Sequence, residues 1–155
     1  MAANGDRGAN AECGRGDLAL ARGTLTLVLD ASVAFQACIT AESFAVFGRE
    51  RLVAPPLLWP EVRSSLHAAL WRRELSPALA RIAFEQLHAA PIGARSPAGL
   101  GAEAWRIADE FGWAKTYDAE YVALASLLKC RLVTADDALR RATARLGFVI
   151  GPTEL

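Results

Sequence analysis

Two short apolar segments of the chain end on an aspartate and lead directly into a helical pattern. The first is LTLVLD, residues 25–30, and the second is RLVTAD, residues 131–136. Short apolar runs rich in Leu, Val and Thr are typical of strands buried in a parallel sheet. In open sheets built from strand-helix units, ligands bind beyond the carboxyl ends of the strands. The two segments therefore predict an α/β fold with acidic side chains at its binding edge.

The remaining segments also alternate between helical and strand-like patterns. Helices are predicted over residues 31–40, 41–48, 57–74, 76–90, 102–112, 116–130 and 136–146. Strands are predicted over 51–56 and 147–151, and the Pro- and Gly-rich stretch 91–101 is a candidate for one more. This alternation predicts a Rossmann-like α/β/α sandwich with a mainly parallel central sheet of about four to five strands.

The chain has the length of one domain. Residues 1–23 are rich in Gly, Ala, Asn and charge without an apolar period, which predicts a disordered tail before a folded domain over 24–155. The first residues show neither the basic nor the apolar region of a signal peptide, and no apolar run reaches the roughly 20 residues of a membrane span. We therefore expect a cytoplasmic protein without membrane association.

The charge and the cysteine and histidine content limit which kinds of binding site the chain can form. The chain has 17 basic and 17 acidic residues, so any contact with nucleic acid depends on a local basic patch. Its three cysteines lack the paired spacing of a disulfide framework or zinc site. His67 and His88 have no ligand partners at helical spacing, which also argues against zinc.

Four acids occupy positions where a predicted strand ends or a predicted helix begins. Asp30 and Asp136 follow strands, and Glu61 and Asp118 lie in the first turns of helices. Taken singly, each is explained by helix capping or by the preference of helix amino termini for negative charge, which contributes roughly 0.3–1 kcal/mol. Together at one sheet edge they would repel one another and require protons or a cation. Oxygen ligands of this kind favour Mg²⁺ or Mn²⁺.

The order of four motifs, LVLDASV, PPLLWPEVRSSL, KTYDAEYVALA and LVTADDAL, resembles the PIN-domain ribonucleases, in particular the VapC-type toxins of toxin–antitoxin pairs. The resemblance covers residues 25–151. It implies that Asp30, Glu61, Asp118 and Asp136 are catalytic, metal-binding acids, with Thr134 and Ser32 as polar partners. Asp137 is an extra acid that either assists the metal or caps the last long helix.

The resemblance also implies an activity and partners. The implied activity is that of an endoribonuclease, which hydrolyses RNA phosphodiester bonds with one or two Mg²⁺ (or Mn²⁺) ions. The implied partners are a second copy of the chain in a homodimer and a cognate antitoxin that blocks the acidic pocket. A metal-dependent phosphatase or DNA nuclease on the same acids stays open as an alternative, as does a non-catalytic PIN-like interaction module whose acids cap helices. A response-regulator receiver ranks lower because the expected late lysine is missing and Asp118 opens a helix.

Local basic and aromatic side chains are further candidates for RNA contact. Arg49, Arg51, Arg72 and Arg73 are the basic candidates, although arginines of this kind are more often solvated or ion-paired. The four tryptophans, Trp59, Trp71, Trp105 and Trp113, are predicted to lie in the core or in an interface rather than to stack on bases.

Overall fold

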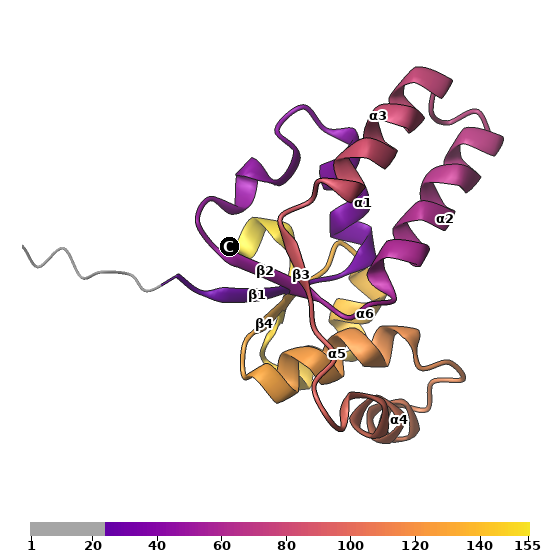
Figure 1. Cartoon of the computed structure of the whole chain (residues 1–155). Coiled ribbons are helices and arrows are strands. Elements are labelled where there is room, and N and C mark those ends of the chain that lie inside the picture. Colours follow the sequence, from indigo (N-terminus) through magenta and orange to yellow (C-terminus); the bar gives the residue numbers. More distant parts are fainter. Residues whose placement is uncertain (1–23) are drawn as a thin grey trace, which may run out of the picture.

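A computed structural model describes residues 24–155, and the predicted tail over 1–23 lies outside the described residues. The chain forms one sheet of five parallel strands in the order β3-β2-β1-β4-β5 (Figure 1). The strands are β1 (Thr26–Leu29), β2 (Arg51–Ala54), β3 (Ile92–Ala94), β4 (Arg131–Val133) and β5 (Val149–Ile150). The predicted α/β class and strand number are confirmed, and the Pro- and Gly-rich stretch does contain a strand.

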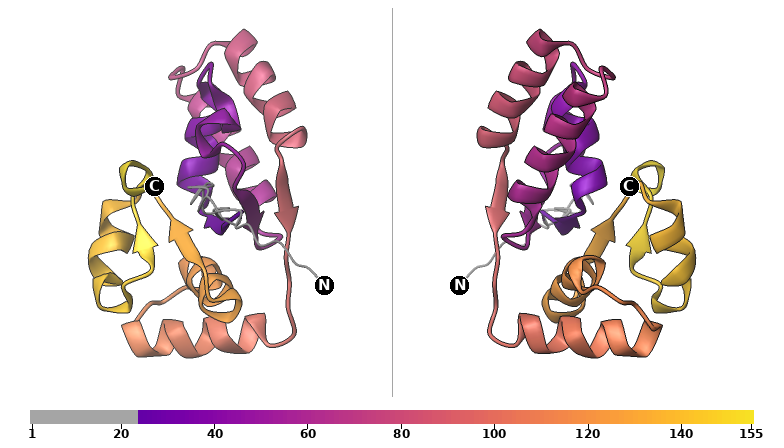
Figure 2. Two further views of the ribbon diagram at one scale, coloured as in Figure 1. Left: turned by 90° about the vertical axis from the view of Figure 1, so that its left-hand side faces the viewer. Right: turned by 90° about the vertical axis from the view of Figure 1, so that its right-hand side faces the viewer.

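Helices cover both faces of the sheet. They are α1 (Ala31–Ile39), α2 (Leu58–Trp71), α3 (Pro77–His88), α4 (Leu100–Phe111), α5 (Tyr117–Leu128) and α6 (Asp137–Ala142), with 3₁₀ helices η1 (Ser43–Phe47), η2 (Ala144–Leu146) and η3 (Pro152–Glu154). Helices α1, α2 and α3 pack together on one side of the sheet and α4 packs with α5 on the other, as Figures 1 and 2 show. The predicted α/β/α layering is therefore confirmed.

The predicted helix over 136–146 is divided in two. Helix α6 ends at Ala142, and the buried Thr143 hydroxyl donates a hydrogen bond of 2.7 Å to the carbonyl oxygen of Leu139. A threonine that bonds back to the preceding turn in this way disturbs the regular helix. The segment then continues as η2.

The core is centred on β1 and α5. Val28 and Leu29 of β1 have no exposed surface, because the strand lies between β2 and β4 with helices above and below. Helix α5 is buried around much of its circumference, including Val122, Leu124 and Ala125. A helix that is apolar on nearly all sides belongs inside the protein. Its packing holds the amino end of α5, which carries Asp118, at a defined place.

The centre of the sheet is a topological switch point. From β1 the chain adds β2 and then β3 on one side, and it later crosses to add β4 and β5 on the other. Leu29 and Val133 are paired in register, and the backbone N–H of Asp30 donates to the Val133 carbonyl at 3.0 Å. The residues that follow β1 and β4 therefore meet at the crevice where sheets of this type bind ligands.

Two tryptophans depart from the prediction of core burial. Trp59 and Trp113 pack against the core as predicted. Trp71 and Trp105 are 82% and 67% exposed, so they do not lie in the core, and of the predicted core or interface positions only an interface stays open for these two. None of the helices within residues 24–155 combines the length and the apolar character needed to cross a membrane.

Candidate active site

Asp30 is a buried carboxylate held by three hydrogen-bond donors. Its residue is only 6% exposed, and its Oδ2 accepts from the Thr134 hydroxyl at 2.7 Å and from the Ser32 backbone N–H at 3.3 Å. The Ser32 hydroxyl donates to the same oxygen. Both residues predicted as polar partners therefore contact Asp30 directly. Since every bond goes to Oδ2, the Oδ1 atom has no hydrogen bond to residues 24–155.

The same two hydroxyls organise the turn after β4. The Thr134 oxygen accepts from the Asp136 backbone N–H at 3.0 Å, and the Ser32 oxygen accepts from the Ala135 N–H at 3.0 Å. Each hydroxyl thus donates to Asp30 and accepts from the neighbouring loop. A hydrogen-bond network of this kind fixes the relative position of the β1 and β4 ends.

Asp136 and Asp137 have different structural roles. One oxygen of Asp136, Oδ1, accepts from the backbone N–H groups of Ala138 at 2.7 Å and Leu139 at 3.0 Å, so Asp136 caps α6. Asp137 lies in the first helical turn and forms an ion pair with Arg140, whose guanidinium lowers the pKa of the Asp137 carboxyl. The hypothesis that Asp137 caps the helix is therefore wrong, because the preceding aspartate does so.

Glu61 is joined to α5 by a side chain that the sequence did not single out. The buried Tyr121 hydroxyl donates to Glu61 Oε2 at 2.7 Å, which links α2 to α5. Tyr121 follows Asp118 by three residues on α5, and residues at this spacing lie on the same helix face. That spacing is the one sequence signal that points to Tyr121 as part of the site.

The four predicted acids influence one another electrostatically. Burial raises the pKa of the half-buried Glu61, the hydrogen bond from Tyr121 opposes this rise, and the charges of Asp30, Asp118 and Glu120 add to it. Asp118 lies at the exposed rim, yet partial burial of its carboxyl and the charges of Asp30 and Asp136 raise its pKa as well. The structure therefore brings Asp30, Glu61 and Asp118 within electrostatic reach of one another, and Asp136 within reach of Asp118.

No basic side chain balances this cluster within residues 24–155. The six ion pairs of that region involve other acids, such as Glu74, Glu103 and Glu110. Each of the four carboxylates also keeps at least one oxygen without a hydrogen bond to the described residues. A concentration of unpaired carboxylate charge beside a buried Asp30 favours a bound cation.

The four acids are not arranged as a complete set of metal ligands. Within the described part of the chain, no group of three or more His, Cys, Asp or Glu side chains is arranged to hold a metal ion. The hydrogen bonds described above contribute to this, since helix capping holds Asp136 and the Tyr121 hydroxyl holds Glu61. The donor set fits a hydrated Mg²⁺ or Mn²⁺ bound through one or two carboxylates, which is how Mg²⁺ commonly binds.

Two of the four predicted basic RNA contacts lie away from the acids. Arg49 and Arg51 are at the amino end of β2, whereas the acids lie beyond the carboxyl ends of the strands. They are therefore poorly placed to hold a substrate at the site. Arg72 and Arg73 follow the carboxyl end of α2, the helix that carries Glu61.

The raised pKa of Glu61 makes stability depend on pH. When the folded pKa exceeds the unfolded one, the folded state binds more protons between the two values, so stability falls as pH rises through that window. Glu61→Gln removes this charge. We expect the melting temperature of the variant minus that of wild type, both measured in EDTA, to be higher at about pH 8 than at about pH 5. A difference that stays constant across this range would contradict the electrostatic account.

Comparisons with known proteins identify the family of this chain. Residues 27–144 match the PIN domain family. The chain is 34% identical over 111 residues to the VapC ribonuclease Mb0985 of Mycobacterium bovis and to ribonuclease VapC9 of Mycobacterium tuberculosis, which covers 71% of this chain and 85% of each relative. The crystal structure of PAE2754 from Pyrobaculum aerophilum has the same fold, with a TM-score of 0.65 and 24% identity over 85% of this chain and 94% of that one. The chain therefore belongs to the PIN-domain family and is a VapC-type member of it.

Proposed function

We propose that the protein is a Mg²⁺- or Mn²⁺-dependent endoribonuclease and the toxin of a toxin–antitoxin pair. The observation that carries this proposal is the set of four acids without a basic partner at the switch point of the sheet, in which the charges of Asp30 and Asp136 act on Asp118 and those of Asp30 and Asp118 act on Glu61. The relatives named as VapC ribonucleases support RNA as the substrate.

Each side chain of the site has a role in the proposed reaction. Asp30 and Asp118 are the principal metal ligands, and Asp136 and Glu61 hold a second ion or its water molecules. Thr134 and Ser32 orient Asp30, and Tyr121 orients Glu61, through the hydrogen bonds described above. When bound, a divalent cation supplies the positive charge that allows water to attack the phosphodiester. Asp137 has no part in this scheme because Arg140 engages it.

The proposed partners follow from the same family membership. They are a cognate antitoxin that covers the acidic site and a second copy of this chain in a homodimer. With RNA and an antitoxin as its proposed partners, the cytoplasm is the location that we propose for the toxin.

One alternative has an observation in its favour. Because the acids of residues 24–155 form no ready-made group of three ligands, a non-catalytic PIN-like module that binds no metal accounts for part of the structure. Such a module would leave RNA intact under all metal conditions.

The proposal is tested by mapping new RNA ends. Purified, antitoxin-free protein is incubated with a mixed RNA pool in Mg²⁺, Mn²⁺ or EDTA, with single-stranded DNA and a phosphomonoester as parallel substrates. We expect discrete internal cuts in RNA that require the metal. Cleavage of DNA or release of phosphate instead would identify the DNA nuclease or the phosphatase, and intact RNA in Mg²⁺ and Mn²⁺ would favour the non-catalytic module.

A further inference from the structure

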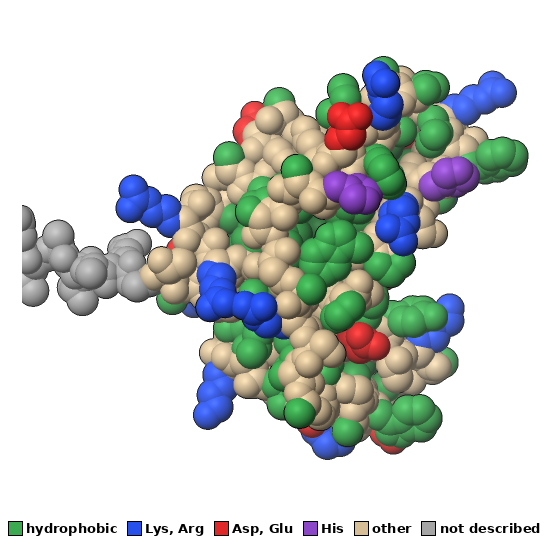
Figure 3. Space-filling model, viewed as in Figure 1, with side chains coloured by type: hydrophobic (Ala, Val, Ile, Leu, Met, Phe, Trp, Pro, Cys, Tyr) green, Lys and Arg blue, Asp and Glu red, His purple; other side chains and the backbone are tan. Residues whose placement is uncertain are grey.

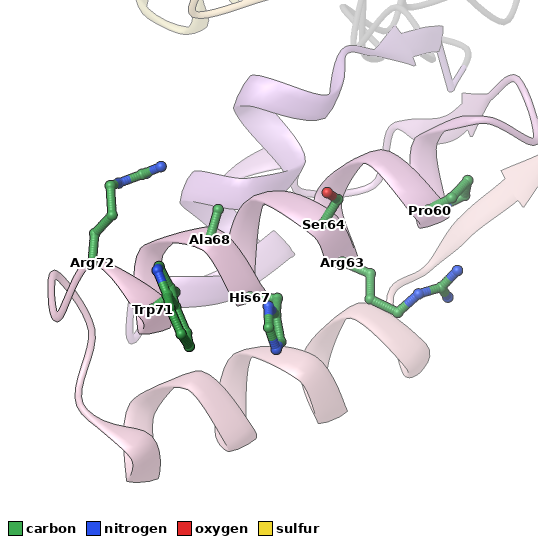
Figure 4. A pocket seen from close by; sticks show the side chains of 7 residues that line it. All are labelled: Pro60, Arg63, Ser64, His67, Ala68, Trp71 and Arg72. Carbon is green, nitrogen blue, oxygen red and sulfur yellow. The ribbon is translucent and has the colours of Figure 1, made fainter.

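One face of α2 forms a shallow groove beyond the acids. The groove has a volume of about 530 Å³. It is lined by Pro60, Arg63, Ser64, His67, Ala68, Trp71 and Arg72. Figure 4 shows these side chains in two rows along the helix, with Arg63, His67 and Trp71 in one and Pro60, Ser64, Ala68 and Arg72 in the other. Residues three and four apart share a helix face, so the sequence spacing itself builds the groove.

The groove is continuous with the site. A second hollow is lined by Leu57, Pro60, Glu61, Ser64, Ser65 and Tyr117, and it shares Pro60 and Ser64 with the groove. Glu61 therefore lies at the start of a surface that continues along α2 to Trp71. With a rise of 1.5 Å per residue, this path is about 15 Å long. A polymer held at the acids can extend along it.

The segment that contains most of the groove is more basic than the chain as a whole. From residue 62 to residue 90 there are four arginines and two histidines against two glutamates, whereas the whole chain is neutral. Figure 3 shows both histidines and several basic side chains gathered over α2 and α3. The groove lining contains no acid, and Arg63 forms no ion pair with the described residues. Arg72 pairs with Glu74, but both side chains are exposed, and such pairs are weak.

Trp71 exposes a large aromatic ring at the end of the groove that is farthest from the acids. Its side chain is 82% exposed, although the ring offers a large apolar area that is normally buried. His67 lies one helical turn before it and is exposed as well. Exposed aromatic faces together with arginines are the elements from which proteins build sites for single-stranded nucleic acid, because bases stack on the rings and phosphates meet the cations.

We propose that the Arg63–His67–Trp71 face of α2 binds the single-stranded RNA next to the bond that is cut, with a base stacked on Trp71 and a phosphate at Arg63. This inference deepens the proposed nuclease function and rests on it. The groove places the strand on one side of the acids, so the flanking sequence contributes to substrate choice.

The test is RNA binding in the absence of cutting. Fluorescein-labelled single-stranded RNA of about 12 nucleotides is titrated with the full chain in EDTA and followed by anisotropy. We expect Trp71→Ala to weaken binding at least about fivefold, the lower end of a lost base stack. Arg63→Ala should weaken binding and also reduce the slope of log affinity against log salt by about 0.7, the effect of one lost phosphate contact on a single strand.

Matched variants supply the controls. Trp105→Ala removes another exposed tryptophan, on α4. Arg49→Ala removes an arginine just before the amino end of β2, at the end of the strands opposite to the acids. Both should bind RNA like wild type, and all four variants should melt like wild type because the replaced side chains are exposed. Equal losses in the groove variants and the controls, or no loss in the groove variants, would overturn the inference. No RNA binding by wild type would overturn it too.

Cleavage in Mg²⁺ separates this inference from the proposed function. If groove variants lose RNA binding while wild type never cuts, the groove binds RNA but the nuclease proposal fails, and with it the placement of the groove next to a cut bond. If wild type cuts and the groove variants bind and cut equally well, the groove proposal fails and the nuclease stands. If Trp71→Ala changes only self-association or antitoxin binding, the groove is a protein interface and the RNA inference is wrong.

Discussion

Replacing Asp118 by asparagine is expected to reduce RNA cleavage at least ~100-fold, because metal charge stabilisation amounts to several kcal/mol and each 1.36 kcal/mol corresponds to a factor of ten. The substitution keeps the size of the side chain and removes its charge. The Asp118 carboxylate forms no ion pair or hydrogen bond with the described residues, so the fold does not depend on it. Initial rates of RNA cleavage in Mg²⁺ measure the effect.

The same variant is expected to melt at a higher temperature than wild type in EDTA. Burial and the charges of Asp30 and Asp136 raise the pKa of Asp118, so its ionised form opposes folding at neutral pH. Asp109→Asn is the matched control, since this exposed aspartate lies on α4 outside the cluster. The control should cut RNA and melt like wild type. Full activity in Asp118→Asn would contradict the role assigned to this carboxylate.

Thr134→Val is expected to destabilise the protein by ~1–3 kcal/mol and to lower cleavage by roughly 10–100-fold. The threonine has no exposed surface, and its hydroxyl both donates to Asp30 and accepts from the Asp136 N–H. Valine has nearly the same shape but leaves the Asp136 N–H without its acceptor. Denaturant unfolding and cleavage rates, measured in parallel, give the two effects.

Thr134→Ser separates the hydroxyl from the methyl group of this side chain. Serine keeps the donor and the acceptor, so it should retain most of the activity even though the lost methyl group costs some stability. If Thr134→Ser and Thr134→Val lose activity equally, packing and not the hydrogen bonds would position Asp30, and our account of this residue would be wrong.

The strands and the acids could be predicted because they depend on local sequence. The apolar run before Asp30 identifies a buried strand, and the place of an acid at the end of such a strand follows from parallel topology alone. Glu61 and Asp118 lie in first helical turns, as predicted, because apolar periodicity marks where α2 and α5 begin. These features need no knowledge of distant contacts.

The features that were missed depend on contacts between distant segments or on competition between neighbours. The bond from Tyr121 to Glu61 joins residues 60 positions apart, and although the spacing from Asp118 points to Tyr121, nothing local identifies Glu61 as its partner. Either of two adjacent aspartates could cap α6, and the pairing of Asp137 with Arg140 leaves the cap to Asp136. Trp71 is exposed because it lies at the carboxyl end of α2, where its only neighbours in the groove are residues of α2 itself and Arg72.

The central claim is that Asp30, Glu61, Asp118 and Asp136 form a divalent metal centre, and a Mn²⁺ titration of metal-free protein tests it most directly. Binding is followed by calorimetry and by the melting temperature, for wild type and for the double variant Asp30→Asn with Asp118→Asn. We predict saturable binding by wild type, with about 2.7 kcal/mol of added stability when free Mn²⁺ is 100 times its Kd, and none by the double variant. A wild-type protein that neither binds Mn²⁺ nor gains stability from it, or a double variant that binds equally well, would contradict the claim.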